Sequence, residues 1–440
     1  ASVNDVHNID VLLGVNTNKE QAFSMYGYGL RGVSDDVYYY NPQKVPPVVN
    51  HGTPEFPDYA ATRYYSSDFT EKRMVSYFGR LGYNYKQRYL LEFTFRRDGS
   101  STFGEGNRWA NFPSVAVGWS FSEEPFIKRL TGGWLNWGKI RGSYGKSGQT
   151  FTSAYLAHGL MNIMDKSFFG KTGITTDKPV SPYLTWEKTR QYDLGLDMDM
   201  FNYRLNVKLD YYYKYTSSLI YDIPIPGSLY AFGAQVENAM EISNEGLELE
   251  LQADILRESA VSWRMKFNMA RNWNRFEKSY SGKDVVDGDG TLLVVGRPLN
   301  GLYVWAHRGY YNSDAEVPRL YKIDGQEIYF NGVATNGISG AVGDYRLLDL
   351  DGDGNPDSYY AGSPLPLAHG GWVNELMWKN FDLNVLVNFT IGRKMINNRM
   401  GLGFSRQSED GHLTKLFDYR KLRPWDGVNK KPNAPAWGNS

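Results

Sequence analysis

The sequence has no cysteine among its 440 residues, and its charges balance, with 48 Lys+Arg against 48 Asp+Glu. The absence of cysteine excludes disulfide scaffolds, thiol catalysis and cysteine-based zinc sites. A net charge of zero argues against a nucleic-acid-binding protein, because such a protein needs a basic excess to neutralise phosphates.

Long apolar runs are also missing. The mean hydropathy is −0.50, and no run approaches the roughly 18 residues of a membrane helix, which excludes a helical membrane protein. Residues 1–15 show neither the basic nor the apolar region of a signal peptide, so we expect that one was removed or that the chain begins in mid-protein. A transmembrane β-barrel is compatible with these values, because its alternating strands average out as polar.

What the sequence does have is strict alternation of apolar and polar residues. It is clearest in residues 192–200, 205–215 and 381–391. These predicted strands reach about ten residues, whereas strands of soluble proteins average about five or six. About ten residues is what a tilted strand needs to cross a bilayer, and tyrosines crowd the strand ends as an interfacial girdle requires. A soluble β-sandwich is the alternative, but its strands are shorter and its turns more frequent.

Connection lengths also alternate. Twelve strands are predicted near residues 7–15, 22–30, 73–85, 88–97, 112–122, 137–147, 188–200, 204–216, 241–254, 262–274, 367–378 and 381–392. Every second connection is short, and the others include long loops near residues 31–72, 148–187, 217–240 and 275–366. Short periplasmic turns and long extracellular loops are typical of outer-membrane barrels. We therefore predict an all-β chain, with residues 1–440 forming part of one transmembrane antiparallel β-barrel.

Motifs for catalysis are weak. Residues 27–32 fit GxGxxG but are not followed by a helix start, which a dinucleotide site needs. Residues 142–148 resemble a phosphate loop, but Ile140 stands where its first glycine is required. The six histidines are dispersed without metalloprotease spacing. The sequence therefore predicts no enzyme, no catalytic residue and no required cofactor.

One acidic segment matches the start of a calcium loop. Oxygen ligands at alternate positions converge on a hard cation, and Gly354 permits the tight turn. Position 12 is Tyr360, so the bidentate glutamate of an EF-hand is missing. The two interpretations are a weak structural calcium site and an acidic turn without metal. The candidate ligands are Asp349, Asp351, Asp353, Asn355 and Asp357.

Several stretches together resemble the SusC/RagA class of TonB-dependent outer-membrane transporters. They include residues 76–128, 134–149, 184–226, 244–251, 349–357 and 378–392, in the order that the class has them. The resemblance implies a barrel of roughly 22 strands with a plugged lumen, of which this chain supplies about twelve. It also implies import of oligosaccharides or peptides, a SusD-like lid lipoprotein, and energy from the TonB complex.

Some class features have no counterpart in this sequence. The plug, the TonB box and the last strands are absent, so we expect an internal fragment of the barrel, with TonB acting through the absent N-terminal part. Met240 stands where the class usually has glycine, and Tyr359 and Tyr360 replace a usual charged tail.

The predicted function is therefore import of oligosaccharides, or of peptides, across the bacterial outer membrane. A passive porin, an adhesin or structural barrel, and a secreted soluble binding protein are the alternatives. Carbohydrate sites use aromatic platforms with polar neighbours, although loop aromatics serve loop packing or a lid interface equally well. The candidate substrate-binding residues in the long loops are Tyr38, Tyr39, Tyr40, Trp305, Tyr310 and Tyr311.

Overall fold

The computed structural model describes residues 2–3, 6–29, 48–50, 59–61 and most of 63–396, with short gaps that include 287–291, 322–326, 333–337 and 351–356. Its centre is one antiparallel sheet of 12 strands that follow one another in chain order. The sheet strands are β1 (Ser2–Val3), β2 (His7–Gly29), β5 (Arg63–Tyr85), β6 (Tyr89–Ser100), β7 (Trp109–Trp119), β8 (Leu135–Gln149), β11 (Glu187–Met200), β12 (Leu205–Pro224), β13 (Ala234–Leu256), β14 (Val261–Lys278), β25 (Ala368–Trp378) and β26 (Phe381–Ile391).

The remaining elements lie in the connections. Two short helices are α1 (Pro125–Thr131) and α2 (Gly227–Tyr230), and 3₁₀ turns cover Phe121–Glu123 and Asp314–Glu316. The small two-stranded sheets pair β3 (Val48–Asn50) with β4 (Tyr59–Ala61), β9 (Met161–Phe168) with β10 (Lys171–Thr176), β15 (Val285–Val286) with β16 (Leu292–Leu293), β17 (Leu302–Trp305) with β24 (Ser358–Gly362), β18 (His307–Tyr310) with β23 (Tyr345–Leu347), β19 (Arg319–Tyr321) with β20 (Glu327–Tyr329), and β21 (Asn331–Gly332) with β22 (Ile338–Ser339).

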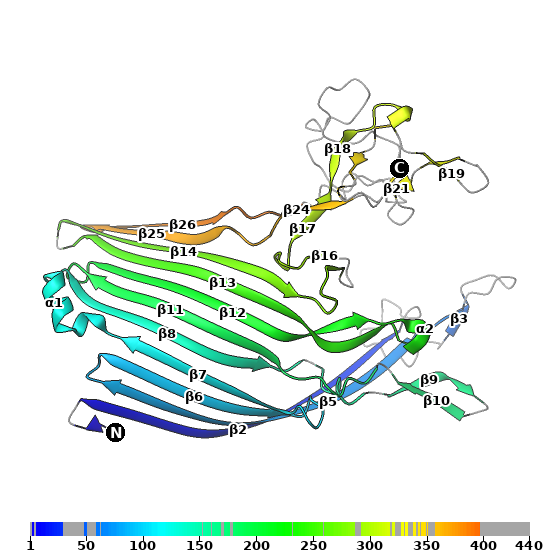
Figure 1. The fold of residues 1–440 in the computed structure, drawn as a ribbon, viewed down its shortest axis with the longest axis horizontal. Helices are drawn as coiled ribbons and strands as arrows, with labels where there is room; N and C mark the ends of the chain where they lie inside the picture. Colours follow the sequence, from blue (N-terminus) through cyan, green and yellow to red (C-terminus); the bar gives the residue numbers. More distant parts are fainter. Residues whose placement is uncertain are drawn as a thin grey trace, which may run out of the picture.

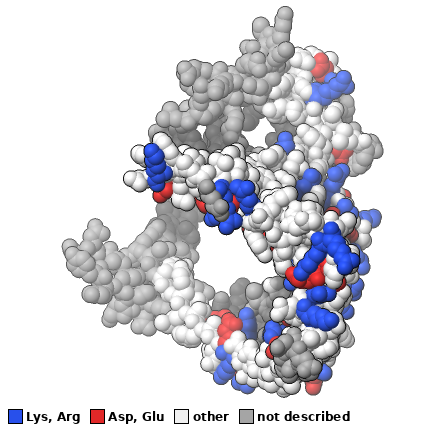
Figure 2. All heavy atoms as spheres, turned by 90° about the vertical axis from the view of Figure 1, so that its left-hand side faces the viewer, with Lys and Arg blue, Asp and Glu red and all other residues white. Residues whose placement is uncertain are grey.

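Connection lengths alternate only in part, because residues 120–134 at one end outnumber residues 101–108 and 225–233 at the other, and most of the loop expected at residues 217–240 is strand. The connections at residues 86–88, 201–204 and 379–380 gather at one end of the sheet, together with α1 (Figure 1). We call this the turn end. The long connections, including residues 150–186 and 279–367, leave the opposite end, which we call the loop end. Seen from the turn end, the sheet curves around an open hollow (Figure 2).

The hairpin predicted at residues 7–15 and 22–30 is wrong. The structure has the single strand β2, which pairs with β5 without a register shift from His7↔Tyr85 to Gly29↔Arg63. In the polar stretch at its middle, Gln21 Nε2 donates to Glu71 Oε2 at 2.7 Å. A polar run resembles a turn in sequence, but here it continues the strand beyond the apolar part of the sheet.

The register separates the side chains of the sheet onto two faces. Leu209 lies between Leu196 on β11 and Leu249 on β13, whereas its neighbour Lys208 lies between Asp197 and Glu250. We call these the apolar face and the polar face. Many apolar-face side chains are uncovered, as in Leu13 with 80% exposure. Because so much exposed apolar surface is costly in water, this face needs a hydrocarbon environment.

Aromatic rings border the apolar face at both ends. At the turn end, Trp134 stacks on Phe201 with ring centroids 6.1 Å apart. Toward the loop end, Tyr192 contacts Tyr144 and Tyr213 at 4.8 and 6.4 Å. Residues 192 to 201 span about 30 Å along a strand. If the strand is tilted by roughly 45°, the height that these residues cover along the membrane normal approaches the ~25 Å apolar band of outer-membrane barrels.

The turn end is held by one carboxylate ahead of α1. Glu124 Oε1 accepts hydrogen bonds from Tyr89 Oη at 2.7 Å and Trp119 Nε1 at 3.4 Å, and Arg88 Nη1 lies 3.5 Å from Oε2. The Tyr89 hydroxyl above all holds the pKa of the Glu124 carboxyl below its usual range. This cluster therefore ties β6, β7 and α1 together. Across the described residues, no helix has both the length and the apolar character to cross a membrane.

Spin labels test the assignment of the two faces. Because the chain has no cysteine, Leu209→Cys and Val387→Cys give single labels on the apolar face, with Lys208→Cys and Asn388→Cys as partners on the polar face. In membranes, we expect oxygen to relax the first pair and a water-soluble nickel complex to relax the second. Nickel accessibility at Leu209 and Val387 equal to that at Lys208 and Asn388 would contradict the barrel assignment.

Candidate functional site: the polar face and the loop end

Many cations on the polar face are paired with carboxylates on the same strand or on a neighbouring one. Representative pairs join Arg80 to Asp10 at 2.7 Å and Lys266 to Glu375 at 2.8 Å. Further pairs are Arg96–Asp98, Lys208–Glu250 and Arg264–Asp254. Such a wall presents many hydrogen-bonding groups but little net charge. It is suited to a water-filled interior that a polar solute traverses.

Arg141 is the centre of the most extended of these contacts. Its side chain crosses β11 from β8, so that Nε lies 3.0 Å from Asp197 and Nη2 lies 2.5 Å from Asp210 on β12. Gly195 lies between Arg141 and Asp210 in the register. A Cβ at Gly195 would come within 2.4 Å of Arg141 Cζ. The missing side chain therefore lets one guanidinium bridge three strands.

Buried aromatic residues fix the long connection 150–186 at the loop end. Phe103, Phe112 and Trp186 form one cluster, with Phe103 and Trp186 rings 4.9 Å apart. Trp186 Nε1 donates to the Arg108 carbonyl at 3.2 Å. Asn238 on β13 donates from Nδ2 to the Thr185 carbonyl at 2.9 Å and accepts from Thr185 N–H at 2.8 Å. Cores at its two ends thus anchor this connection.

The predicted aromatic residues lie in different environments. Tyr38, Tyr39 and Tyr40 are outside the described residues. Trp305 is exposed at the end of β17, whereas Tyr311 is buried with 6% exposure. Their role in substrate binding stays a prediction.

Tyr310 belongs to a small aromatic cluster that the sequence did not indicate. Its ring stacks on Tyr345 at 5.1 Å, and His307 contacts the other side of this pair at 4.7 Å from Tyr345. Burial, followed by the Tyr345 phenol, raises the pKa of Tyr310 to about 12, so its hydroxyl stays protonated at neutral pH. Tyr345 is 35 positions further along the chain, and only the β18–β23 pairing brings it here.

A second aromatic pair lies at the base of the same segment. Tyr303 on β17 contacts Tyr360 on β24 at 5.7 Å, and Arg297 Cζ stands 5.0 Å from the Tyr360 ring. Tyr360 is the residue that occupies position 12 of the acidic motif. In this fold its ring contacts Tyr303 and the Arg297 guanidinium.

Most of the acidic segment lies outside the described residues, namely Asp349, Asp351, Asp353 and Asn355. Asp357 is described, and its Oδ2 accepts the Leu350 N–H at 2.5 Å. Its backbone N–H donates to the Leu348 carbonyl at 2.9 Å. Asp357 therefore closes the loop that carries the other carboxylates. Within the described part of the chain, no group of three or more acidic or histidine side chains could hold a metal.

The glycine-rich motifs lie on strands. Gly27 and Gly29 end β2, and residues 142–148 lie within β8. Residues 142–148 therefore do not form the strand-to-helix turn that presents backbone N–H groups to phosphates, whereas Gly32 of the first motif lies outside the described residues. That these motifs bind no nucleotide stays a prediction.

Residues 3–360 match the family model described as "TonB dependent receptor-like, beta-barrel". The chain belongs to this family. It is 34% identical to a TonB-dependent receptor of Formosa agariphila over 85% of this chain and 37% of that protein. It is 30% identical to the TonB-dependent receptor SusC of Bacteroides thetaiotaomicron over 82% of this chain and 35% of that protein.

Among solved structures, the fold matches the RagAB peptide importer in its closed-closed state. The TM-score is 0.71 at 22% identity, covering 93% of this chain and 42% of that one. These similarities confirm the SusC/RagA resemblance, the barrel fold and the outer-membrane location, and the relatives are receptors and transporters, not enzymes. The chain spans about two fifths of the length of these relatives. The apolar face is thus the lipid-facing side, and the polar face lines the lumen.

A glycine substitution tests the Arg141 bridge. Gly195→Ala should displace the guanidinium and lower the free energy of unfolding by about 1–2 kcal/mol, as steric strain in a packed site does. Gly142→Ala is the matched control on the other face, because its Cβ would have only ordinary contacts at 3.8 Å. Urea unfolding in detergent measures both variants. Equal midpoints would show that Gly195 is not needed for the bridge.

Proposed function

We propose that this chain forms part of the barrel of a TonB-dependent importer of oligosaccharides, with peptides as the second substrate class. The observation that carries the proposal is the paired lumen wall, in a chain of a TonB-dependent receptor family. A wall whose charges are already paired offers hydrogen bonds to a neutral, hydroxyl-rich solute without a strong net field. A charged solute would instead have to compete with pairs such as Arg141–Asp210.

The loop end supports a lidded entrance in this proposal. The long connections all leave the sheet on the side that family topology makes extracellular. A SusD-like surface lipoprotein would cover them, and the exposed Trp305 and the Tyr310–Tyr345 pair are among the described aromatic groups that would meet substrate or lid. Energy would come from the TonB complex through a part of the receptor outside this chain.

Energy coupling distinguishes this proposal from a passive porin or an adhesin. The intact receptor would be expressed in its native outer membrane, and uptake of labelled neutral oligosaccharides would be followed with and without TonB. We expect uptake to fall to the background of a receptor-deletion strain when TonB is lost, with the oligosaccharides recovered chemically unchanged. Uptake that survives loss of TonB favours the porin, and uptake of a matched peptide mixture alone favours the second substrate class.

We also propose that the acidic segment binds calcium structurally and weakly. Support comes from the spacing of its carboxylates and from Asp357, which closes the loop. Calcium should protect residues 349–357 of the intact receptor from proteolysis at about 10⁻⁴–10⁻³ M, the range of extracellular modules. Asp351→Ala together with Asp353→Ala should abolish this protection, whereas Asp382→Asn, a distant carboxylate change, should leave it. If calcium changes proteolysis in neither the unaltered receptor, the double variant nor Asp382→Asn, the acidic turn without metal is favoured.

A further inference from the structure

Several cations toward the loop end of the lipid-facing side differ from the paired cations of the lumen wall in their counter-ions. Lumen-facing Arg96 lies 2.7 Å from Asp98 and donates to Ser76 at 2.9 Å. Its neighbour Arg97 points to the lipid-facing side, is exposed, and has no ion pair with any described residue. The same holds, among the described residues, for three more exposed cations toward the loop end of the lipid-facing side: Lys146, Arg190 and Arg271.

These cations stand at the aromatic border of the apolar band. Lys146 and Arg190 are register partners, one alternate position beyond the Tyr144–Tyr192 pair. The Arg97 guanidinium lies 5.3 Å from the Trp109 ring centroid, and that ring stacks on Tyr77 at 6.1 Å. Arg271 has the same environment, 4.5 Å from the ring of Trp273. The loop end is extracellular, so these side chains lie at the depth of outer-leaflet headgroups.

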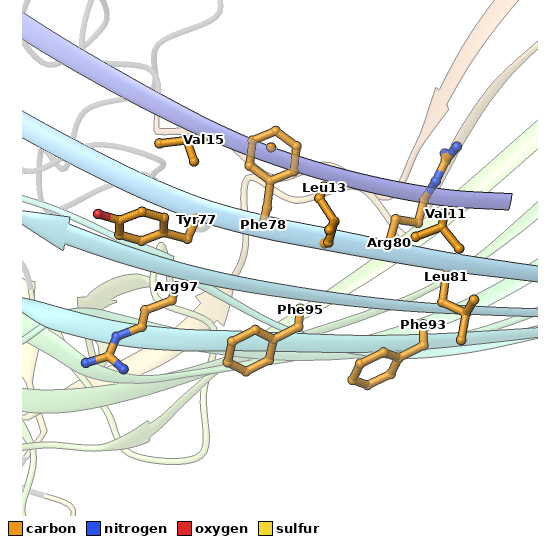
Figure 3. Close-up of a pocket in the computed structure, with 12 residues that line it drawn as sticks. Val11, Leu13, Val15, Tyr77, Phe78, Arg80, Leu81, Phe93, Phe95 and Arg97 are labelled. Carbon is orange, nitrogen blue, oxygen red and sulfur yellow. The ribbon is translucent and has the colours of Figure 1, made fainter.

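An apolar groove runs along the sheet from Arg97 toward the turn end. Gly79 has no side chain, which leaves a depression between Leu13 on β2 and Phe95 on β6. The groove has a volume of about 950 Å³. In Figure 3, Arg97 and Tyr77 stand at one end of it, and Phe93 and Leu81 stand toward the other. An elongated apolar depression that ends at a cation matches an acyl chain attached to an anionic headgroup.

We propose that this groove binds a phosphorylated glycolipid of the outer leaflet. One acyl chain lies over Gly79, and a phosphate group is held by Arg97. A guanidinium donates two parallel hydrogen bonds to phosphate, and contact with Trp109 orients it for this role. Lys146, Arg190 and Arg271 continue the row of phosphate partners around the barrel. The lipid thus supplies the counter-ions that these four side chains lack among the described residues.

Lipid binding to the purified intact receptor tests the proposal. Bisphosphorylated lipid A is added to the receptor in detergent, and native mass spectrometry measures the bound fraction. Arg97→Gln should weaken binding about fivefold, which is the effect of one basic side chain at a membrane surface. Arg97→Lys should retain most of the affinity. Gly79→Leu should weaken binding by filling the groove, since a Cβ there already lies 3.0 Å from Leu13 Cδ2.

Arg129→Gln is the matched control, because it removes an exposed cation on α1 at the turn end. It should bind lipid A like the unaltered receptor. Arg97 is exposed and breaks no described ion pair when replaced, so folding, checked by heat-modifiable electrophoretic mobility, should be unaffected. Dephosphorylated lipid A should bind the unaltered receptor no better than lipid A binds Arg97→Gln.

Two results would overturn the proposal. One is equal lipid A binding by Arg97→Gln and Arg129→Gln. The other is Arg97-dependent binding of phosphatidylglycerol that matches lipid A, which would make the site one for phosphate-bearing lipids in general. Neither result depends on solute uptake, so the import proposal and the lipid proposal can fail separately.

Discussion

The structure depends on one constraint: a single layer of sheet must satisfy two solvents at once. Strands within a bilayer can satisfy their backbone hydrogen bonds only with neighbouring strands. Side chains of a strand alternate between its two faces. Of any two consecutive residues, one must therefore have an apolar side chain that faces lipid and the other a polar side chain that faces water. Leu209 and Lys208 show the result, as neighbours with an apolar row and an ion-paired row on opposite sides. The continuous pairing of β11 with β12, and of β12 with β13 from Leu205 to Thr216, keeps both rows aligned across strands.

This constraint explains what could be predicted from the sequence. Wherever a strand lies within the apolar band, apolar and polar side chains must alternate at every second residue. The strands predicted from this alternation near residues 188–200, 204–216 and 381–392 match β11, the start of β12, and β26. Beyond the band, both faces meet water and the period disappears. The middle of β2 lies in that zone, and only its pairing with residues 71–76 identifies it as strand. Such a pairing spans dozens of residues and leaves no local signal.

For the loop end, the sequence predicted where the long connections lie but not which of their side chains contact one another. Aromatic residues in long connections could be named, but their partners could not. Tyr310 stacks on Tyr345 because β18 pairs with β23, and Tyr360 meets Tyr303 because β24 pairs with β17. Arg141 is intermediate between these cases. Alternation places it on the lumen side, yet its reach to Asp210 depends on Gly195 in the strand between them, which only the register reveals.

Charge pairing connects the composition to the two surfaces. The chain as a whole is neutral, with equal numbers of acidic and basic residues, but this balance is not distributed evenly over the sheet. In the lumen, Arg80, Arg96 and Arg141 each meet a carboxylate across or along the strands. Paired charges of this kind fix side-chain positions and leave a wall of dipoles with little net field. On the lipid side toward the loop end, Arg97 and Arg271 have no ion pair with a described residue, and anionic headgroups would stabilise them there. The same alternation that divides apolar from polar residues therefore also places cations such as Arg80 beside carboxylates of the lumen wall and cations such as Arg97 where the membrane would supply the counter-ion.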